Sequence, residues 1–426
     1  MKFDLGIIGA GPAGYTAAFH ARAKGLSVVL FEKDKIGGVC LNKGCIPTKA
    51  ILHSAELYEE MKCSSDLGIK CFDLSVDYEK VVERKDKIVE KLRRSLELAL
   101  KNAGVVVVNA EATLSRISDF RAAQAEIQPS PIGRGEYLVQ AGGEVYECEK
   151  VITATGSAPR DFENLRFDHE FVLSSDDILN LKKLPESIVI IGSGAIGIEW
   201  ARIFSAFEVD VTIVEMAEHL LPVADIEVSK RVERIFKAKK IKTYLSNSVE
   251  KIENKKVYLA SGDVLEPELV LLAAGRVPQK ISNNVTCIGD ACGKIQLAHF
   301  AIKQALAEIS GIEFDEELVP SVVYGCPEIA WVGKREQDLA EGTYKKANLL
   351  ISALGKSHCD NCTEGFIKIL SQDGKVIGVH IVSKEASALI QQITIAMQNN
   401  LSIEDLKRVC FAHPTYSEGI FECLFK

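Results

Sequence analysis

The sequence predicts an α/β fold with two dinucleotide-binding units of the Rossmann type. Two glycine-rich turns support this prediction, Gly9-Ala10-Gly11-Pro12-Ala13-Gly14 and Gly192-Ser193-Gly194-Ala195-Ile196-Gly197, and each follows a short apolar stretch. Each turn leads into a helical pattern and then into a strand that ends in a glutamate. A chain of 426 residues is too long for one ordinary core, so we expect two to four domains.

The first unit contains each residue type that dinucleotide binding requires. Gly9 allows the tight turn, Gly11 allows a pyrophosphate to approach the backbone, and Gly14 allows the helix to pack on the strand. Glu32 is expected to accept hydrogen bonds from the hydroxyls of an adenosine ribose. The expected elements are strands over residues 3–8 and 27–31 and a helix that reaches about residue 24.

The second unit repeats the first at the same internal spacing. Strands are expected over residues 187–191 and 210–214, and Gly192 precedes Glu215 by 215 − 192 = 23 positions, as Gly9 precedes Glu32 by 32 − 9 = 23. A single glycine-rich turn often has no ligand, but two copies at equal spacing indicate two dinucleotide sites. Glu215 favours NAD over NADP, because a carboxylate repels a 2′-phosphate.

Two cysteines, Cys40 and Cys45, follow the first unit. In a regular helix, residues five apart differ by about 7.5 Å in rise and about 140° in azimuth, so their Cα atoms lie beyond the roughly 7 Å that a disulfide can bridge. A bond between these cysteines therefore requires an irregular helix start, which the neighbouring glycines permit. The helix should become regular from about Ile46, since Pro47 is tolerated in a first turn.

The position of this cysteine pair favours redox chemistry over the alternative of two buried structural thiols. A thiolate near a helix N-terminus is stabilised by the positive end of the helix dipole, which makes it a usable nucleophile. Because the pair directly follows a dinucleotide-binding unit, the ligand of that unit is expected to carry a redox-active ring. A flavin meets this requirement.

The composition excludes several classes of function. A net charge of −8 argues against a nucleic-acid partner and against an anionic membrane surface. No apolar run approaches the 18 to 20 residues of a membrane span, and Asp4 interrupts any apolar signal segment. The 12 cysteines show no regular pairing pattern, so we expect a reducing, cytoplasmic compartment.

Three further segments are weaker candidates for cofactor contacts. Residues 151–156, which end in Thr155-Gly156, and residues 270–276, which include Gly275, are apolar strands that end at small residues. Each is either a core strand with a glycine turn or a place where the backbone approaches a cofactor. Asp290 follows a short apolar run, so it is either a turn residue or an acceptor for the sugar-alcohol chain of a flavin.

His413 is a candidate general base. Pro414 follows it directly, and Glu418 lies five residues further on. In such a pair the imidazole takes a proton, while the carboxylate selects its tautomer and stabilises the imidazolium ion. The alternative is a capped helix start, with Thr415 or Ser417 as the cap.

Together these motifs resemble the flavin-dependent pyridine nucleotide-disulfide oxidoreductases over nearly the whole chain. The most specific matches are residues 37–49, the two glycine turns, residues 288–291 with 297–299, residues 319–330 and residues 413–418. The resemblance implies FAD and NAD as cofactors and a fold of two Rossmann-like domains plus an α+β C-terminal dimerisation domain. The implied boundaries are 1–160 for the FAD domain, 161–278 for the NAD domain, 279–317 for a central or second FAD part, and 318–426 for the dimerisation domain.

The resemblance also implies a reaction and its partners. The expected reaction oxidises a dihydrolipoyl dithiol and reduces NAD, in a 2-oxoacid dehydrogenase or glycine cleavage complex. The alternative is an NADH-dependent reductase of another small disulfide, while a mere scaffold subunit would need none of Cys40, Cys45 and His413. The expected partners are a second copy of the chain and a lipoyl-bearing acyltransferase or carrier protein, with no nucleic acid, membrane or metal.

The roles of individual residues follow from the same resemblance. Cys40 would be the interchange thiol that faces substrate, and Cys45 would face the flavin. His413 and Glu418 would reach the active site of the other subunit. Lys49 and Glu199 would form an ion pair beside the isoalloxazine, and Ile196 would lie near the nicotinamide. The other implied cofactor contacts are Gly9, Gly11, Pro12, Ala13, Gly14, Glu32, Lys33, Gly38, Val39, Ala112, Thr155, Gly156, Gly192, Gly194, Gly197, Glu215, Val249, Gly275, Asp290 and Ala298.

Two features depart from the family pattern. Only 290 − 276 − 1 = 13 residues separate Arg276 from Asp290, so a hairpin and strand before that carboxylate are expected to be trimmed. The second departure is a CxxC pair, Cys359 and Cys362, near the C-terminus. No second pair has the spacing of a zinc site, so surface thiols are expected here in preference to a metal site.

Overall fold

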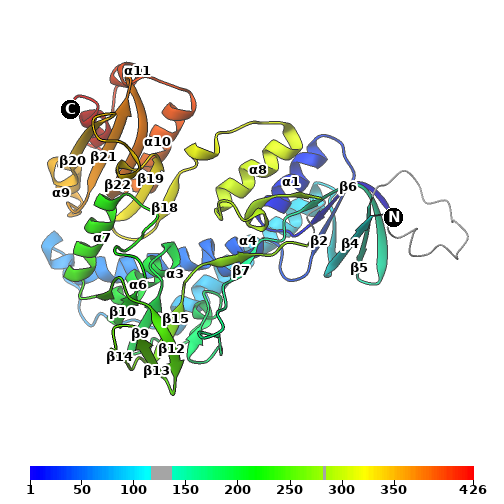
Figure 1. Cartoon of the computed structure of the whole chain (residues 1–426), viewed down its shortest axis with the longest axis horizontal. Coiled ribbons are helices and arrows are strands. Elements are labelled where there is room, and N and C mark those ends of the chain that lie inside the picture. Colours follow the sequence, from blue (N-terminus) through cyan, green and yellow to red (C-terminus); the bar gives the residue numbers. More distant parts are fainter. Residues whose placement is uncertain (117–136, 282–284) are drawn as a thin grey trace, which may run out of the picture. The chain divides into compact units, whose positions relative to one another are not determined.

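The computed structural model describes residues 1–116, 137–281 and 285–426 (Figure 1). These residues form two compact units, and each contains parallel strands with helices packed against them, which confirms the predicted α/β class. The first unit consists of Met1–Ala50, Lys80–Arg160 and Arg276–Phe314, and the second of Ile51–Glu79, Asp161–Gly275 and Asp315–Lys426.

The first glycine turn lies at the end of the central strand of the first unit. Strand β1 (Lys2–Ile8) pairs in parallel with β2 (Val28–Glu32) on one side and with β6 (Glu144–Thr153) on the other. Beyond them, β3 (Val106–Asn109) pairs with β2, and the short β17 (Thr286–Cys287) pairs with β6. The two strands predicted to flank the first glycine turn are therefore confirmed.

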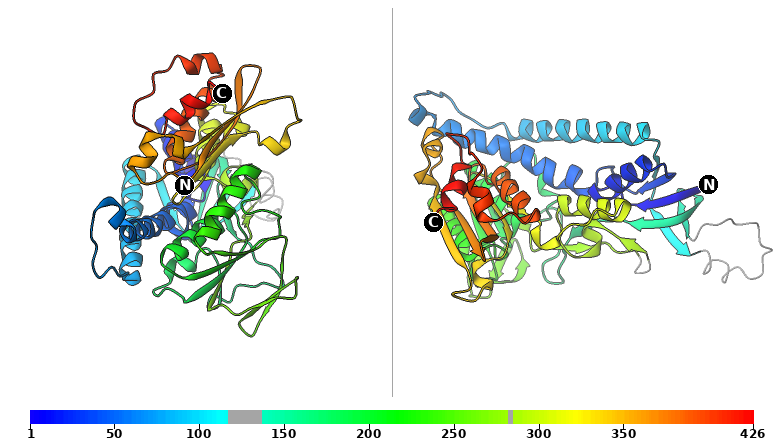
Figure 2. Two further views of the ribbon diagram at one scale, coloured as in Figure 1. Left: turned by 90° about the vertical axis from the view of Figure 1, so that its left-hand side faces the viewer. Right: turned by 90° about the horizontal axis from the view of Figure 1, so that it is seen from above.

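Both faces of this sheet are covered at β1 and β2, which explains why residues 28–31 and the end of β1 are buried and apolar. Ile7 packs into the core beneath helices α1 (Pro12–Ala23) and α8 (Ala298–Ser310), which lie side by side (Figure 2). Its neighbour Ile8 belongs to the core of the opposite face, because successive side chains of a strand alternate. The remaining elements are α4 (Tyr78–Asn102), most of which belongs to this unit, β4 (Ala112–Arg116), β5 (Tyr137–Ala141), β7 (Ser157–Pro159) and β16 (Arg276–Pro278). The sheet of the first unit is mixed, because β5 pairs antiparallel with β6 and with β4.

The second glycine turn lies in a five-stranded parallel sheet of the second unit, with strand order β11-β10-β9-β15-β8. Strands β9 (Ser187–Ile191) and β10 (Asp210–Val214) have the predicted bounds, and α6 (Ala195–Ala206) begins inside the turn. A three-stranded antiparallel sheet, β12-β13-β14, shares a core with this sheet. The other elements are β8 (Val172–Leu173), α7 (Ile226–Ala238), β11 (Lys242–Tyr244), β12 (Val249–Glu253), β13 (Lys256–Leu259), β14 (Val264–Leu265) and β15 (Leu269–Leu272).

The C-terminal part of the second unit has the predicted α+β architecture. Its five strands form an antiparallel sheet in the order β18-β19-β22-β21-β20, and Ile381 of this sheet shares a core with Ile390 and Tyr416. The elements are β18 (Ser321–Val323), β19 (Glu328–Gly333), β20 (Lys345–Leu350), α9 (Gly355–Cys359), β21 (Phe366–Gln372), β22 (Lys375–Ser383), α10 (Ala386–Gln398), α11 (Ile403–Lys407) and α12 (Glu418–Cys423).

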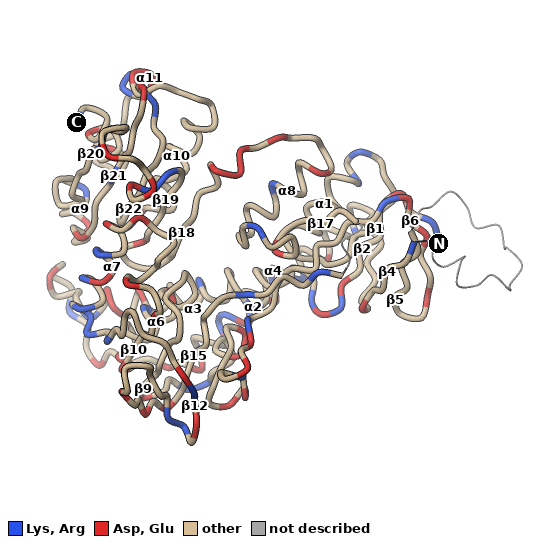
Figure 3. Tube along the Cα trace, viewed as in Figure 1, with Lys and Arg blue, Asp and Glu red and all other residues tan. Residues whose placement is uncertain are grey.

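Charged residues of both signs are interspersed along the elements of both units (Figure 3). On α4, for example, Glu90 and Arg94 form an ion pair at 2.5 Å, one helical turn apart. Among the described residues, no helix combines the length and the apolar character needed to cross a membrane.

Candidate redox site

Cys40 and Cys45 form a disulfide, with their Cα atoms 4.7 Å apart. Cys40 lies in the short helix α2 (Gly38–Lys43), and α3 (Cys45–Lys62) begins at Cys45 itself. The two helices are separated by Gly44, whose φ of −148° and ψ of −109° lie outside the helical region. This break confirms the predicted irregular helix start, because a regular helix would hold the two Cα atoms too far apart.

Asn42 fixes the segment between the two cysteines, a role that the sequence analysis missed. Its Nδ2 donates hydrogen bonds to the carbonyl oxygens of Gly38, at 2.9 Å, and Ile36, at 3.0 Å. The neighbouring Lys43 pairs with the carboxylate of Asp34 at 2.7 Å. Asparagine side chains often hydrogen-bond to nearby backbone groups, so an asparagine in this glycine-rich segment could have predicted this role.

The disulfide segment packs directly against the first glycine turn. The N–H of Gly37 donates to the carbonyl oxygen of Ala10 at 2.9 Å. A Cβ atom on Gly38 would lie 2.6 Å from the Cα of Gly11, so glycine is required for this approach. The cysteines are therefore held beside the residues that are predicted to receive a pyrophosphate.

The two glycine turns share one construction. A Cβ on Gly14 would lie 1.8 Å from the carbonyl oxygen of Gly9, and a Cβ on Gly197 would lie 2.0 Å from that of Gly192, so each helix starts in contact with its strand. By contrast, a Cβ on Gly194 would meet no described atom within 4 Å. A phosphate can approach the backbone at this point, so the residues of the turn fit a bound dinucleotide.

The glutamate of each unit is oriented by its own glycine turn. Glu32 accepts a hydrogen bond from the N–H of Ala10, and Glu215 accepts one from the N–H of Ser193, both at 2.8 Å. The other oxygen of each carboxylate accepts from the N–H two residues further along the chain, at 2.9 and 2.8 Å respectively. The equal spacing in the sequence thus corresponds to the same hydrogen-bond pattern in both units. The sequence did not predict that backbone N–H groups would hold each glutamate in place.

Asp290 belongs to a hydrogen-bonded chain within the first unit. Ser157 donates from Oγ to Oδ2 of Asp290 at 2.7 Å, and Arg276 donates from Nε to Oγ of Ser157 at 2.8 Å. Asp290 lies in a single 3₁₀ turn (Gly289–Cys292). Although the connection from Arg276 is short, it still brings this carboxylate back to the end of β6, while residues 282–284 lie outside the described residues.

His413 and Glu418 form the predicted pair. Nδ1 of His413 lies 2.7 Å from Oε1 of Glu418, and Oε2 of Glu418 accepts a hydrogen bond from the N–H of Thr415 at 2.9 Å. The bond with His413, followed by that with Thr415, holds the pKa of Glu418 below its usual value. A carboxylate at Nδ1 favours the tautomer in which Nε2 carries the lone pair, so Nε2 is the atom able to accept a proton. The side chain of His413 is exposed.

A disulfide beside one dinucleotide turn, together with a second turn of the same design, is the arrangement expected of a disulfide oxidoreductase that uses two dinucleotides. Residues 3–296 match the pyridine nucleotide-disulphide oxidoreductase family, and residues 319–423 match its dimerisation domain. The chain belongs to this family. It is an oxidoreductase that uses FAD and NAD(H), which confirms the predicted cofactors, and the dimerisation domain supports a homodimer.

Several characterised relatives match this oxidoreductase over nearly its whole length. The dihydrolipoyl dehydrogenase of Mycoplasma pneumoniae is 30% identical, with 99% of this chain and 97% of the relative covered. The mitochondrial dihydrolipoyl dehydrogenase of Homo sapiens is 31% identical, with 98% and 89% covered. Leghemoglobin reductase of Vigna unguiculata is 33% identical, with 98% and 86% covered.

The fold is also that of solved structures. The crystal structure of LpdA from Mycobacterium tuberculosis superimposes with a TM-score of 0.88 at 23% identity, and 100% of this chain and 99% of that chain are covered. The HOCl-induced flavoprotein disulfide reductase RclA from Escherichia coli superimposes with a TM-score of 0.82 at 23% identity, with 99% of each chain covered. These two likenesses confirm the predicted fold.

Glu199 of the oxidoreductase is buried in α6, where its Oε1 accepts a hydrogen bond from the N–H of Tyr324 at 3.1 Å. Lys49 lies in the first turns of α3, in the other unit. Their ion pair stays a prediction. The other predicted contacts lie at element ends, namely Lys33 after β2, Val39 in α2, Ala112 at the start of β4, Thr155 and Gly156 after β6, Ile196 in α6, Val249 at the start of β12, Gly275 before β16 and Ala298 at the start of α8.

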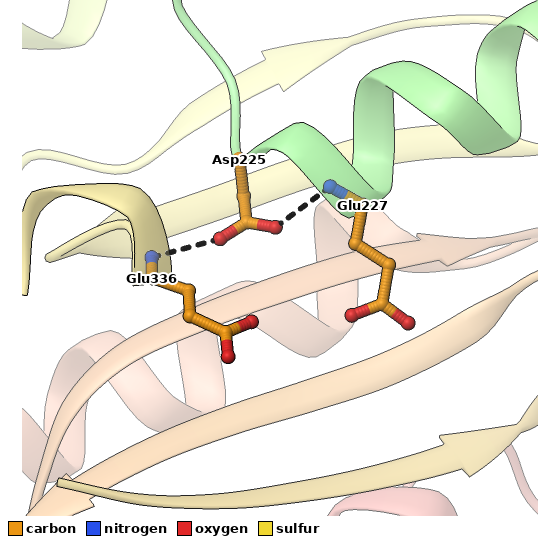
Figure 4. A group of neighbouring side chains, drawn as sticks. All are labelled: Asp225, Glu227 and Glu336. Carbon is orange, nitrogen blue, oxygen red and sulfur yellow. Dashed lines mark hydrogen bonds between the residues drawn. The ribbon is translucent and has the colours of Figure 1, made fainter. Parts of the chain in front are cut away.

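Three carboxylates of the second unit, Asp225, Glu227 and Glu336, lie close enough together to ligate a metal ion (Figure 4). The ammonium group of Lys368 lies among them, 2.8 Å from Asp225 and 3.4 Å from Glu227, and it also pairs with Glu336. The side chains of Asp225 and Lys368 are fully buried. This lysine supplies the positive charge that a metal would otherwise provide, so the cluster is an ion-pair network.

Asp225 also joins two elements through its backbone contacts. Its carboxylate caps α7 by accepting from the N–H of Glu227 at 3.0 Å, and it accepts from the N–H of Glu336 at 2.9 Å (Figure 4). Burial raises the pKa of Asp225, but His380, Lys368 and the N–H of Glu336 outweigh it and hold that pKa below its usual value. The network therefore links α7 to β21 and to the segment after β19 within the second unit.

The CxxC pair is only partly as expected. Cys359 is exposed, as predicted for a surface thiol. Cys362, however, is half-buried, and the thiol of Cys326, which lies far away in the sequence, is close enough to lower its pKa. The expectation of two surface thiols is therefore wrong for Cys362, because its partner comes from another loop that no local spacing reveals.

Proposed function

We propose that this oxidoreductase oxidises dihydrolipoamide to lipoamide and reduces NAD, as the dehydrogenase component of a 2-oxoacid dehydrogenase or glycine cleavage complex. The observation that carries the proposal is the Cys40–Cys45 disulfide held against the first glycine turn. The choice of substrate is supported by relatives named dihydrolipoyl dehydrogenase that align over 98% or more of the chain.

The first step is a proton transfer to His413. Its Nε2 takes a proton from one substrate thiol, because Nδ1 is engaged by Glu418. The substrate sulfur attacks Sγ of Cys40, the Cys40–Cys45 bond breaks, and its electron pair leaves with Cys45 as a thiolate. Glu418 stabilises the imidazolium ion formed in this step.

The second step closes the lipoyl disulfide. The remaining substrate thiol releases its proton to solvent, and its sulfur attacks the substrate sulfur that is bonded to Cys40. The lipoyl sulfur–sulfur bond forms, and Cys40 leaves and is protonated through His413. Two substrate thiols have then become one disulfide, while the protein disulfide has become two reduced cysteines.

The remaining residues hold the cofactors in this proposal. FAD would supply an acceptor for the electron pair of the reduced cysteines and a hydride donor for NAD. Gly11, Gly38 and Asp290 would hold FAD, while Gly194 and Glu215 would hold NAD, together with the other contacts predicted from the sequence. The proposed domain boundaries are 1–160, 161–278, 279–317 and 318–426.

The proposed assembly is a cytoplasmic homodimer. In it, the His413–Glu418 pair of each subunit serves the cysteine pair of the other. The proposed substrate is presented by a lipoyl-bearing acyltransferase or carrier protein. The exposure of His413 in the single chain is consistent with a role at a site completed by a second subunit.

The test is a Cys45→Ser variant of the full-length holoenzyme. We expect lipoamide turnover to be abolished while FAD remains bound. Without Cys45 no protein disulfide forms, so no sulfur can leave as a thiolate when the substrate attacks Cys40. Cys359→Ser, which alters an exposed cysteine, is the matched control and should retain turnover. Full turnover by Cys45→Ser would refute the mechanism, and a wild-type enzyme that reduces another small disulfide but not lipoamide would refute the substrate.

A further inference from the structure

A second pair of cysteines has the same spacing as the redox disulfide. Cys287 and Cys292 are 292 − 287 = 5 positions apart, as Cys40 and Cys45 are 45 − 40 = 5 apart. The intervening residues include Asp290, which is the proposed flavin contact. Cys287 ends the short strand β17, and Cys292 ends the 3₁₀ turn that follows.

The turn brings the two cysteines into contact. Sγ of Cys292 lies 3.3 Å from the carbonyl oxygen of Cys287 and 3.0 Å from that of Gly289, so the side chain of Cys292 folds back onto the residue that carries the other thiol. Gln304 of α8 fixes the turn, since its Oε1 accepts from the N–H of Gly289 at 2.8 Å and lies 3.5 Å from Cys292. Both thiols are half-buried, so small molecules can reach them.

The two thiols are chemically unequal. The neighbouring thiol of Cys292 outweighs burial and lowers the pKa of Cys287 to about 6. The neighbouring Cys287, with burial, raises the pKa of Cys292. The lowered pKa favours a thiolate nucleophile at Cys287, and the raised pKa favours a thiol that keeps its proton at Cys292. By contrast, burial raises the pKa of Cys148 to about 12, as expected of an inert core thiol.

We propose that Cys287 and Cys292 are a second redox dithiol, which a hydroperoxide converts into a disulfide. The Cys287 thiolate attacks the peroxide, the O–O bond breaks, and Cys287 becomes a sulfenic acid as hydroxide leaves. The thiol of Cys292 then attacks this sulfur, a sulfur–sulfur bond forms, and water leaves. Overall, two thiols and one hydrogen peroxide give one disulfide and two waters.

Oxidation at this place acts on flavin binding, an effect that rests on the proposed role of Asp290. The new bond removes the S–H hydrogen of Cys292 from the carbonyl oxygen of Gly289 and ties together the two residues that flank Asp290. We expect this constraint to shift the turn and to weaken the hydrogen bond from Ser157 to Asp290. The oxidised protein is therefore expected to release flavin faster than the reduced protein.

The chain offers a direct readout of this disulfide. Trypsin cleaves after Lys280 and Lys294, so one peptide, residues 281–294, contains both cysteines and no other. The reduced holoenzyme is titrated with hydrogen peroxide, alkylated and digested. We expect this peptide to become lighter by two hydrogen atoms, and unreactive to the alkylating agent, at peroxide concentrations that leave the exposed Cys63 reduced.

Two variants make the result decisive. In Cys292→Ser, Cys287 should accumulate as a sulfenic acid that dimedone traps, because the resolving thiol is gone. In the double variant Cys287→Ser/Cys292→Ser, peroxide should no longer increase the free flavin that passes an ultrafiltration membrane.

The proposal is overturned if Cys63 is oxidised while residues 281–294 keep two alkylatable thiols, or if the disulfide forms without faster flavin release. Peptide mapping uses no lipoamide, so it is independent of whether the proposed reaction is correct.

Discussion

Nδ1 of His413 lies 2.7 Å from Oε1 of Glu418, and this pair is complete within one chain. Thr415 holds the other oxygen of the carboxylate through its backbone N–H, so the glutamate is oriented before any substrate arrives. A carboxylate fixed in this way sets the tautomer of the imidazole and stabilises its protonated form. The His413–Glu418 pair therefore supports the proposed proton transfer, and variants of Glu418 can test this step without changing the cysteines.

The first prediction is that Glu418→Gln lowers kcat/KM for dihydrolipoamide by roughly 10- to 100-fold. The amide keeps the shape of the side chain but removes the charge that stabilises imidazolium. The pH dependence of kcat/KM should therefore change, which a merely structural effect would not produce. Steady-state kinetics across pH measures both changes.

The control for this variant is Glu404→Gln, which removes an exposed carboxylate paired with Lys407 in α11. Its activity and its pH profile should match those of the wild type. An unshifted pH profile in Glu418→Gln, with full activity, would contradict the role of Glu418.

The second prediction separates cofactor binding from folding within one glycine turn. Gly194→Ala should raise KM for NAD by about tenfold, or about 1.4 kcal/mol, at an unchanged melting temperature. The new methyl group meets no described protein atom within 4 Å but occupies the space in which a pyrophosphate approaches. Kinetics with varied NAD and a thermal melt measure the two effects.

Gly197→Ala, in the same turn, should behave in the opposite way. Its Cβ would lie 2.0 Å from the carbonyl oxygen of Gly192, so it should destabilise the fold by about 1–3 kcal/mol. Gly355→Ala is a matched neutral control, since its Cβ meets no described atom within 4 Å. Equal effects of Gly194→Ala and Gly197→Ala on NAD binding and stability would contradict this division of roles.

Local patterns predicted the residues whose partners are close in sequence. The glycine turns, the glutamates 23 positions later (32 − 9 and 215 − 192) and the cysteine pair all belong to short segments whose backbone geometry restricts the choice of residue. The bounds of β9 and β10 could be predicted for the same reason, since both are mostly apolar strands with sharp ends.

The sequence did not predict contacts between distant segments. Lys368 meets Asp225 across 368 − 225 = 143 positions, and Cys326 meets Cys362 across 36 (362 − 326), so neither pair has a local spacing. The pair Cys287 and Cys292 is different, because its spacing is visible in the sequence. It was missed because only one of the two equally spaced cysteine pairs follows a complete dinucleotide fingerprint.

The third prediction concerns the buried ion-pair network. Lys368→Met should destabilise the protein by about 3–5 kcal/mol, because it leaves the fully buried carboxylate of Asp225 without its cation. Lys256→Met, which removes an exposed pair with Glu266, should leave the stability close to that of the wild type. Denaturant titrations of both variants measure the difference in the free energy of unfolding. Equal losses would show that the buried network stabilises the protein no more than an exposed ion pair does.

The fourth prediction concerns pH and Glu56 of α3. Burial, followed by the nearby charge of Glu328, raises the pKa of Glu56 to about 7, although Arg202 opposes this. The folded state therefore binds this proton more tightly than the unfolded state does. The stability that Glu56 contributes is fully present below its ordinary pKa of 4.5, and it declines as the pH rises through about 7.

Glu56→Gln mimics the protonated side chain at every pH, so it should remove this part of the pH dependence. We expect the melting temperature of the wild type to fall relative to that of the variant as the pH rises from about 5 to about 8. Glu313→Gln, at an exposed position, should follow the wild type. Parallel curves for the wild type and Glu56→Gln over this range would show that the carboxyl group is already ionised in the folded protein, and that burial does not control its protonation.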